Sequence, residues 1–196
     1  MEYNLAKILS EDKSGFKIQR INGRHLHIVI GDDRAENHVN QYNIISKTVE
    51  KENINIKALT TPEKEILAGF DFELHPLKMG KKRKSWFLRQ KLEKEEEIYG
   101  MGDKAVIPDL RGRRCIIWGT DTYSYGYGAE PLYKNVPFYI KTTSNSQIGV
   151  FINNSYRLEF DFGYSDDNIQ ISGAGGNIEM YLIFGNSPLE IVSQYT

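Results

Sequence analysis

The sequence is poor in the residues that cross-link a protein or anchor it in a membrane. Among 196 residues there is a single cysteine, Cys115, which excludes an internal disulfide and any metal site built from several cysteines. No run approaches the about 18 consecutive apolar residues of a transmembrane helix, so no membrane partner is expected. The first residues, MEYNLAKILSEDK, carry acidic side chains and lack the apolar segment of a secretory signal, which favours a cytoplasmic protein.

An excess of charge of one sign is also missing. The 25 Lys and Arg residues nearly balance the 26 Asp and Glu residues, and the net charge of -1 offers no overall attraction to nucleic acid. Three motifs are absent as well: Gly-x-Ser-x-Gly, a Gly-Lys-Ser phosphate loop and a strand–glycine–helix dinucleotide motif. No helical pattern follows the short Gly100–Gly102 stretch, which is therefore interpreted as a tight turn where only glycine fits. No cofactor is expected.

What the sequence does contain is period-two alternation of apolar and polar residues. In Tyr156–Phe162 the odd-numbered residues Arg157, Glu159 and Asp161 are polar and the even-numbered ones are apolar, which predicts a strand with one buried face. The run Arg114–Trp118 is apolar enough to predict a strand buried on both faces. The other predicted strands are His25–Ile30, Ile54–Leu59, Phe70–Leu74, Trp86–Leu92, Val136–Ile140, Ile148–Ile152, Ile169–Ile171 and Ile178–Phe184. The predicted fold class is all-β, a large antiparallel β-sandwich of about a dozen strands with very little helix.

Two short segments predict how the chain turns and ends. Asn153–Ser155 lies between two predicted strands and is interpreted as a hairpin turn, because asparagine tolerates a positive φ. Ser187–Glu190 predicts a helix, with serine as N-cap, proline at the first helical position and glutamate as the capping-box partner. The apolar residues of that helix are Leu189, Ile191 and Val192, and we expect all three to belong to an exposed apolar docking surface. A helix of about two turns is not stable alone, so we expect a fragment of a longer protein. Its expected parts are a sandwich over residues 1–186 and a linker helix beginning at 187–196.

Few side chains suit metal or nucleophilic chemistry. His25 and His27 share one face of a predicted strand, but no further ligand stands at zinc-like spacing, so no metal site is expected. The other histidines are His38 and His75. Cys115 lies inside an apolar run, which predicts a buried and inert thiol.

Glycoside hydrolysis needs a pair of carboxylates, and the available ones are Asp109, Asp121, Glu130, Glu159 and Asp161. Asp121 differs from the others because it follows a predicted buried strand directly and precedes Tyr123, Tyr125 and Tyr127. Tyrosine rings stack on the C–H faces of sugars, and carboxylates accept hydrogen bonds from sugar hydroxyls. Composition alone favours a plainer interpretation, in which this Tyr- and Gly-rich loop packs on a neighbouring domain.

Five segments in order resemble the amino-terminal β-sandwich of family 31 glycoside hydrolases, the α-glucosidase and α-xylosidase family. They are Tyr99-Gly-Met-Gly-Asp103, Arg111-Gly112, Trp118-Gly-Thr-Asp121, Pro131-Leu-Tyr-Lys-Asn-Val-Pro-Phe138 and Gly149-Val-Phe-Ile-Asn-Asn-Ser155. The end of the chain, Tyr181–Thr196, resembles the family's link into its catalytic barrel. The family's pattern has Leu, Glu, Asn and Ser where this chain has Met101, Asp103, Gly119 and Asn135.

The resemblance implies a galactose-mutarotase-like supersandwich that precedes a (β/α)8 barrel absent from this chain. The two catalytic aspartates of a retaining α-glycosidase lie in that barrel, so no catalytic residue is expected here. The resemblance implies that Asp121 contacts hydroxyls of an α-linked glycoside or oligosaccharide. Tyr123 and Tyr125, which follow it in the loop, are our further candidates for substrate binding. The expected partners are that substrate, the protein's own barrel and, through the exposed barrel-facing surface, a second copy of the chain. Two alternatives stay open: a free-standing carbohydrate-binding module that uses Tyr123, Tyr125 and Tyr127, and a sugar epimerase that would need a His and Glu pair.

Overall fold

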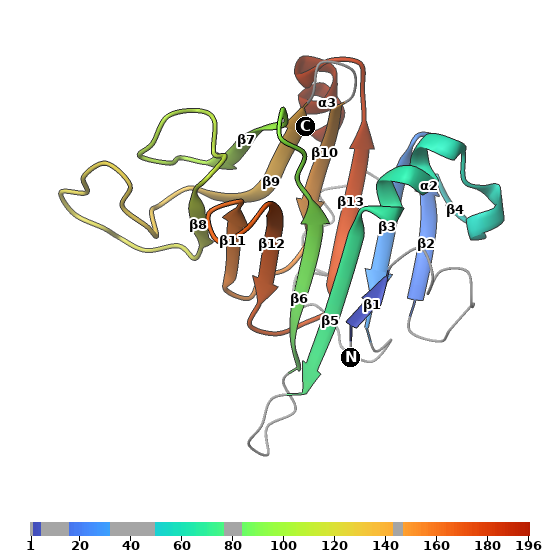
Figure 1. Ribbon diagram of the computed structural model, residues 1–196, viewed down its shortest axis with the longest axis horizontal. Coiled ribbons are helices and arrows are strands. Elements are labelled where there is room, and N and C mark those ends of the chain that lie inside the picture. The colour runs from blue at the N-terminus through green and yellow to red at the C-terminus, as the bar shows by residue number, and fades with distance from the viewer. Residues whose placement is uncertain (1, 5–15, 32–49, 77–83, 143–146) are drawn as a thin grey trace.

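A computed structural model describes residues 2–4, 16–31, 50–76, 84–142 and 147–196, which form two antiparallel β-sheets facing one another (Figure 1). One sheet has six strands in the spatial order β1 (Glu2–Asn4), β5 (Phe70–Pro76), β6 (Lys84–Lys91), β12 (Asn168–Gly173), β11 (Leu158–Phe162) and β8 (Arg114–Ile117). The other has seven strands in the order β4 (Lys51–Asn53), β2 (Phe16–Ile21), β3 (His25–Ile30), β13 (Ile178–Phe184), β10 (Gln147–Ile152), β9 (Asn135–Thr142) and β7 (Glu97–Gly102). The predicted antiparallel β-sandwich is confirmed.

The core fills the space between the two sheets and follows the alternation in the sequence. Leu158, Phe160 and Phe162 of β11 are all buried, as the period-two pattern predicts, and the polar residues between them point away from the core. From the other sheet, Tyr139 of β9 sets its ring edge-on to Phe160 and Phe162, with centroids 6.2 and 5.3 Å apart. Burial of such apolar faces stabilises the sandwich by about 25 cal/mol for each Å² removed from water.

The segment Asn153–Ser155 is not a hairpin turn, and this prediction is wrong. It joins β10 to β11, which lie in different sheets, so the chain crosses the sandwich here. Asn154 is 7 % exposed, and its amide nitrogen donates to the carbonyls of Gly175 and Asn177, both at 3.0 Å. These bonds tie this crossing to another one, between β12 and β13.

The predicted strand Ile54–Leu59 is also wrong, because the segment forms a 3-10 helix, η1 (Ile56–Ala58). The Asn55 side chain caps this turn by accepting from the Lys57 N–H at 3.0 Å. The α-helix α2 (Thr61–Ala68) follows it and had not been predicted. A capping box starts α2: the Thr60 hydroxyl accepts from the Glu63 N–H, and the Glu63 carboxylate accepts from the Thr60 N–H.

Two corrections concern the strands that lead into the loops of interest. Strand β8 is an edge strand and is buried on one face only, because Cys115 and Ile117 point inward while Arg114 is exposed. Gly100–Gly102 is part of β7, where a β-bulge shifts the register against β9, and not a tight turn. Glycine is still required, since a Cβ at Gly100 would lie 2.5 Å from the Phe138 carbonyl oxygen.

The predicted terminal helix is confirmed as α3 (Pro188–Tyr195), with Ser187 as its N-cap. The Ser187 hydroxyl accepts from the Glu190 N–H at 3.1 Å, while the Glu190 carboxylate accepts from the Asn186 N–H at 2.8 Å. Leu189 and Val192 are exposed as expected, but Ile191 is fully buried against the seven-stranded sheet. Within the described ranges, no helix has the length and apolarity needed to span a bilayer.

Candidate functional site

The candidate site is the long connection between β8 and β9, here called the aromatic loop (residues 118–134). It projects from the side of the sandwich, beyond the edge strand β8 (Figure 1, left). Its large side chains are unusually open to solvent, with exposed fractions of 50 % for Trp118, 81 % for Tyr123, 51 % for Tyr125, 65 % for Tyr127 and 48 % for Tyr133. An exposed aromatic cluster of this kind marks a surface that binds a ligand or another domain.

Asp121 lies exposed on the aromatic loop beside Tyr133. A hydrogen bond between the Tyr133 hydroxyl and the Asp121 carboxylate raises the pKa of Tyr133. The same hydroxyl lies 2.9 Å from the carbonyl oxygen of Thr122, and the Thr122 hydroxyl donates to the Pro131 carbonyl at 2.9 Å. Tyr133 therefore holds the backbone at Thr122, next to Asp121, while the Asp121 carboxylate is exposed to water, as a carboxylate that accepts ligand hydroxyls requires.

The three tyrosines after Asp121 do not stack into one platform. Tyr125 packs edge-on against Tyr133, with ring centroids 6.4 Å apart. Tyr127 turns the other way: its hydroxyl accepts from Arg113 at 2.8 Å, and the guanidinium lies 5.3 Å from its ring centroid. Tyr123, the most exposed of the three, presents its ring to solvent. Asp121 and Tyr125 are thus brought together through Tyr133, which lies in a motif singled out in the sequence but had not been assigned to the site.

The other carboxylates considered in the sequence are engaged in structural contacts. Asp109 accepts from the backbone N–H groups of Ile98 and Arg111, both at 3.0 Å. Glu130 pairs with Lys104 at 2.9 Å. Burial would raise the pKa of Asp161, but hydrogen bonds from Ser165, Arg114 and the local backbone outweigh it and hold the pKa below its ordinary value. A general acid needs a raised pKa, so Asp161 does not suit that role, and the oxygens of Asp109 and Glu130 are already engaged by the backbone and by Lys104.

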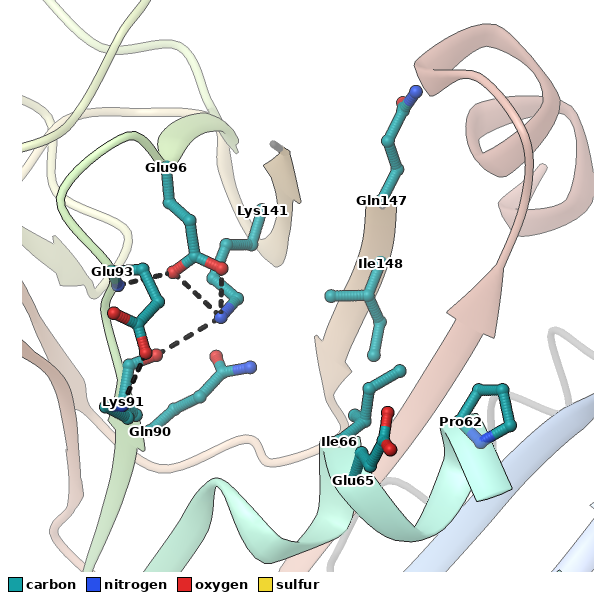
Figure 2. A pocket seen from close by; sticks show the side chains of 10 residues that line it. All are labelled: Pro62, Glu65, Ile66, Gln90, Lys91, Glu93, Glu96, Lys141, Gln147 and Ile148. Atoms are coloured by element: carbon teal, nitrogen blue, oxygen red, sulfur yellow. Dashed lines mark hydrogen bonds and ion pairs between the residues drawn. The ribbon is translucent and has the colours of Figure 1, made fainter. Parts of the chain in front are cut away.

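Apart from the aromatic loop, a concavity of about 300 Å³ lies beside α2, between the two sheets (Figure 2). Pro62, Ile66 and Ile148 line one side of it, and charged groups line the other. There, Lys141 Nζ lies 2.8 Å from Glu96 Oε1, and the ion pair with Lys91 lowers the pKa of Glu93. Glu93 and Glu96 are thus both paired with lysines, whereas the third carboxylate of the lining, Glu65, lies on α2 beside Ile66.

Within the described part of the chain, a His and Glu pair forms that the sequence had not indicated. His27 of β3 lies 2.9 Å from the Glu179 carboxylate of β13 and 3.1 Å from Gln19 Oε1 of β2, and it stacks on Tyr181. Both ring nitrogens are engaged and His27 is 6 % exposed, so the pair braces three strands and is closed to a sugar. Among the described residues, no three His, Cys, Asp or Glu side chains gather closely enough to hold a metal; His38 lies outside them.

Comparisons with known proteins agree with one another. A family model described as the glycosyl hydrolase 31 N-terminal galactose mutarotase-like domain matches residues 6–161. The chain is 32 % identical over 106 residues to "Alpha-glucosidase 2" of Bacillus thermoamyloliquefaciens, which covers 54 % of this chain and 14 % of that protein. It is 36 % identical over 103 residues to "Alpha-xylosidase XylQ" of Lactiplantibacillus pentosus, covering 52 % of this chain and 13 % of that protein.

Among solved structures, a GH31 dextranase of Flavobacterium johnsoniae aligns with 93 % of this chain and 25 % of its own, with a TM-score of 0.65 and 21 % identity. That likeness shows the fold. The chain thus spans only a small part of the length of each of these relatives.

Proposed function

Because this chain belongs to the glycosyl hydrolase 31 N-terminal galactose mutarotase-like domain family, we propose that it is the N-terminal domain of a retaining α-glycosidase. In this proposal the domain is inactive alone and supplies one loop to the sugar site of the whole enzyme. The nucleophile and the acid/base lie in a catalytic (β/α)8 barrel outside this chain. The substrate is an α-linked glycoside or oligosaccharide, since the relatives aligned with it are an alpha-glucosidase and an alpha-xylosidase.

The exposed Asp121 on the aromatic loop is the observation that carries the proposal. An exposed carboxylate whose neighbour Thr122 is tied to Tyr133 is suited to accept hydrogen bonds from sugar hydroxyls. Tyr123 and Tyr125 supply exposed ring faces next to it, on which the C–H faces of a sugar can stack. The loop projects beyond the sandwich, which is the arrangement needed to reach a site on another domain (Figure 1).

We propose that the sandwich comprises residues 1–186 and that residues 187–196 begin the linker helix to the barrel. Two features of α3 support this boundary. Its inner side is anchored to the sandwich by Ile191 and by Tyr195, whose ring stacks on Phe138 at 4.2 Å. Its outer side leaves Leu189 and Val192 exposed, with 78 % and 39 % of their surface open, as expected of a helix that a following domain covers.

The test uses the protein extended by its downstream reading frame, assayed with an aryl α-glucoside and an aryl α-xyloside. Replacing Asp121 by Ala or Asn should raise KM or lower kcat/KM by about tenfold, because a hydrogen bond from a ligand hydroxyl to a charge is lost. The matched control is Asp167→Asn, an exposed carboxylate in the β11–β12 turn, which should leave the kinetics unchanged.

The outcomes separate the proposed function from its alternatives. Hydrolysis by the extended protein together with none by the 196-residue chain supports an accessory domain. If the 196-residue chain hydrolyses the substrate without the downstream part, both catalytic aspartates cannot lie in a barrel outside it, and the proposal is contradicted. Sugar binding by the short chain in a calorimetric titration would favour the free-standing module. Unchanged kinetics of the Asp121 variants would remove that residue from the sugar site.

A further inference from the structure

Lys104 is a buried cation whose three N–H donors all find acceptors. Its side chain is 4 % exposed, and Nζ lies 2.9 Å from Glu130 Oε2, 3.2 Å from the Ile116 carbonyl oxygen and 3.4 Å from Asn135 Oδ1. An ammonium group has three donors and no acceptor, so these contacts use it completely. A buried ion pair is costly to desolvate and is by itself weak support for stability, which raises the question of what this one holds.

The acceptors around Lys104 belong to both ends of the aromatic loop. Ile116 lies in β8 just before the loop, whereas Glu130 is near its end and Asn135 begins β9. Glu130 Oε2 also accepts from the Ile116 N–H at 3.3 Å. One ammonium group, supplied by the segment after β7, therefore closes the loop at its base and joins the strand that enters it to the strand that leaves it.

From this base a continuous series of contacts reaches Asp121. Asn135, which accepts from Lys104, donates through its amide nitrogen to the Leu132 carbonyl at 2.6 Å and lies 3.4 Å from the Tyr133 carbonyl. That geometry fixes the backbone on which Tyr133 stands. The Tyr133 hydroxyl then donates to the carbonyl of Thr122, the residue next to Asp121, at 2.9 Å, and the nearby Asp121 carboxylate raises the pKa of Tyr133.

We propose that Lys104 is a positioning residue for the sugar site: acting through Glu130 and Asn135, it sets where Asp121 is presented. The inference rests on the proposed role of Asp121. Without the ammonium group, the Ile116 carbonyl, Glu130 and Asn135 lose their common hydrogen-bond donor, and the two ends of the loop are no longer held together. The loop then samples positions in which Asp121 misses the sugar hydroxyls. Small displacements of a positioned group are enough to cost binding and rate.

The experiment uses the extended protein and two matched substitutions, Lys104→Met and Lys141→Met. Lys141 is also a buried lysine paired with a glutamate, with side-chain exposures of 14 % for Lys141 and 7 % for Glu96, but its partners lie outside the aromatic loop. Both variants should lower Tm. Only Lys104→Met should raise KM for the aryl glycoside, by about tenfold, and it should speed chymotrypsin cleavage after the tyrosines of the loop.

A double-mutant cycle with Asp121→Ala decides whether Lys104 acts through Asp121. We expect Lys104→Met to change KM little further once Asp121 is Ala. Full additivity, or a KM change equal to that of Lys141→Met, would overturn the positioning role while leaving the sugar site intact. An Asp121→Ala variant with normal KM would instead overturn the site itself, and with it the inference. If Lys104→Met does not fold, Asn135→Ser, which shortens the link to Lys104, takes its place in the same cycle with the same expected non-additivity.

Discussion

Ile191 of α3 lies directly on Gly149 of β10: a Cβ at position 149 would stand 2.6 Å from Ile191 Cγ2 and 2.9 Å from Phe138 Cε2. A Cβ at Gly185 would likewise lie 2.8 Å from Ile191 Cγ1. Because Gly149 and Gly185 have no side chains, they leave a space that Ile191 fills. This packing anchors the eight-residue helix through one fully buried side chain.

Gly149→Ala should therefore loosen α3. We expect the free energy of unfolding to fall by about 1–3 kcal/mol, the usual effect of forcing a methyl group into a packed site, as measured by urea denaturation. Gly126→Ala is the control, because its Cβ would meet no atom within 4 Å, and it should change stability by less than about 0.5 kcal/mol. Equal effects of the two substitutions would contradict the close packing of Ile191.

Glu63 links α2 to the seven-stranded sheet through Arg20, with Oε1 2.5 Å from Nη1 and Oε2 3.0 Å from Nη2. Burial would raise the pKa of Glu63, but hydrogen bonds from Arg20 and Thr60 outweigh it and leave the pKa below its ordinary value of 4.5. The unfolded chain then binds a proton that the folded chain does not, so this stabilisation is present above pH 4.5 and is lost as the pH falls through the folded pKa. Glu63→Gln should cost about 3 kcal/mol at neutral pH and flatten the acid limb of the stability curve. The exposed Glu65→Gln should do neither.

Cys115 should be inert in the folded protein. Burial in the core raises the pKa of its thiol to about 12, so almost no thiolate is present near neutral pH. A thiol reagent such as DTNB should react no faster than the protein unfolds, and at the normal rate once denaturant is added. Rapid reaction without denaturant would mean that β8 opens readily at its edge.

Tyr133→Phe should separate the hydroxyl of this residue from its ring. The ring still packs against Tyr125, and the side chain is half exposed, so Tm should change little. Loss of the contact to Asp121 should raise KM of the extended enzyme by about threefold, less than Asp121→Ala does. Tyr164→Phe is the control. Tyr164 is an exposed tyrosine in the β11–β12 turn, and its ring lies against the guanidinium of Arg114 in β8.

The isolated chain should self-associate through the outer side of α3. Leu189 and Val192 are the exposed apolar residues there, and we expect the sedimentation coefficient to rise with protein concentration. Replacing both by Asp should abolish the rise without lowering Tm, because neither packs in the core. A concentration-independent monomer for the unaltered chain would show that this surface does not associate.

Local patterns along the chain were enough to predict the class of fold and the position of the aromatic loop between two strands. Alternation is local, and it located strands β3, β5, β6 and β8 to β13 but not β1, β2, β4 or β7, while the N-cap at Ser187 predicted α3. Where local rules failed, longer-range contacts had overridden them. Asn153–Ser155 has the composition of a hairpin turn, yet β10 pairs with β13 and β9 while β11 pairs with β12 and β8.

Which polar groups remain available for a ligand depends on contacts between segments that are distant along the chain. In sequence, Glu130 and Asp121 are equivalent acids in one loop. In the structure, Glu130 forms a buried ion pair with Lys104, whereas the Asp121 carboxylate is exposed to water. His27 and Glu179 are 152 residues apart, and nothing local to either announces their contact. The reason is physical: burial and pairing depend on groups brought together by the sheet order, and a sheet order joins strands that are distant along the chain.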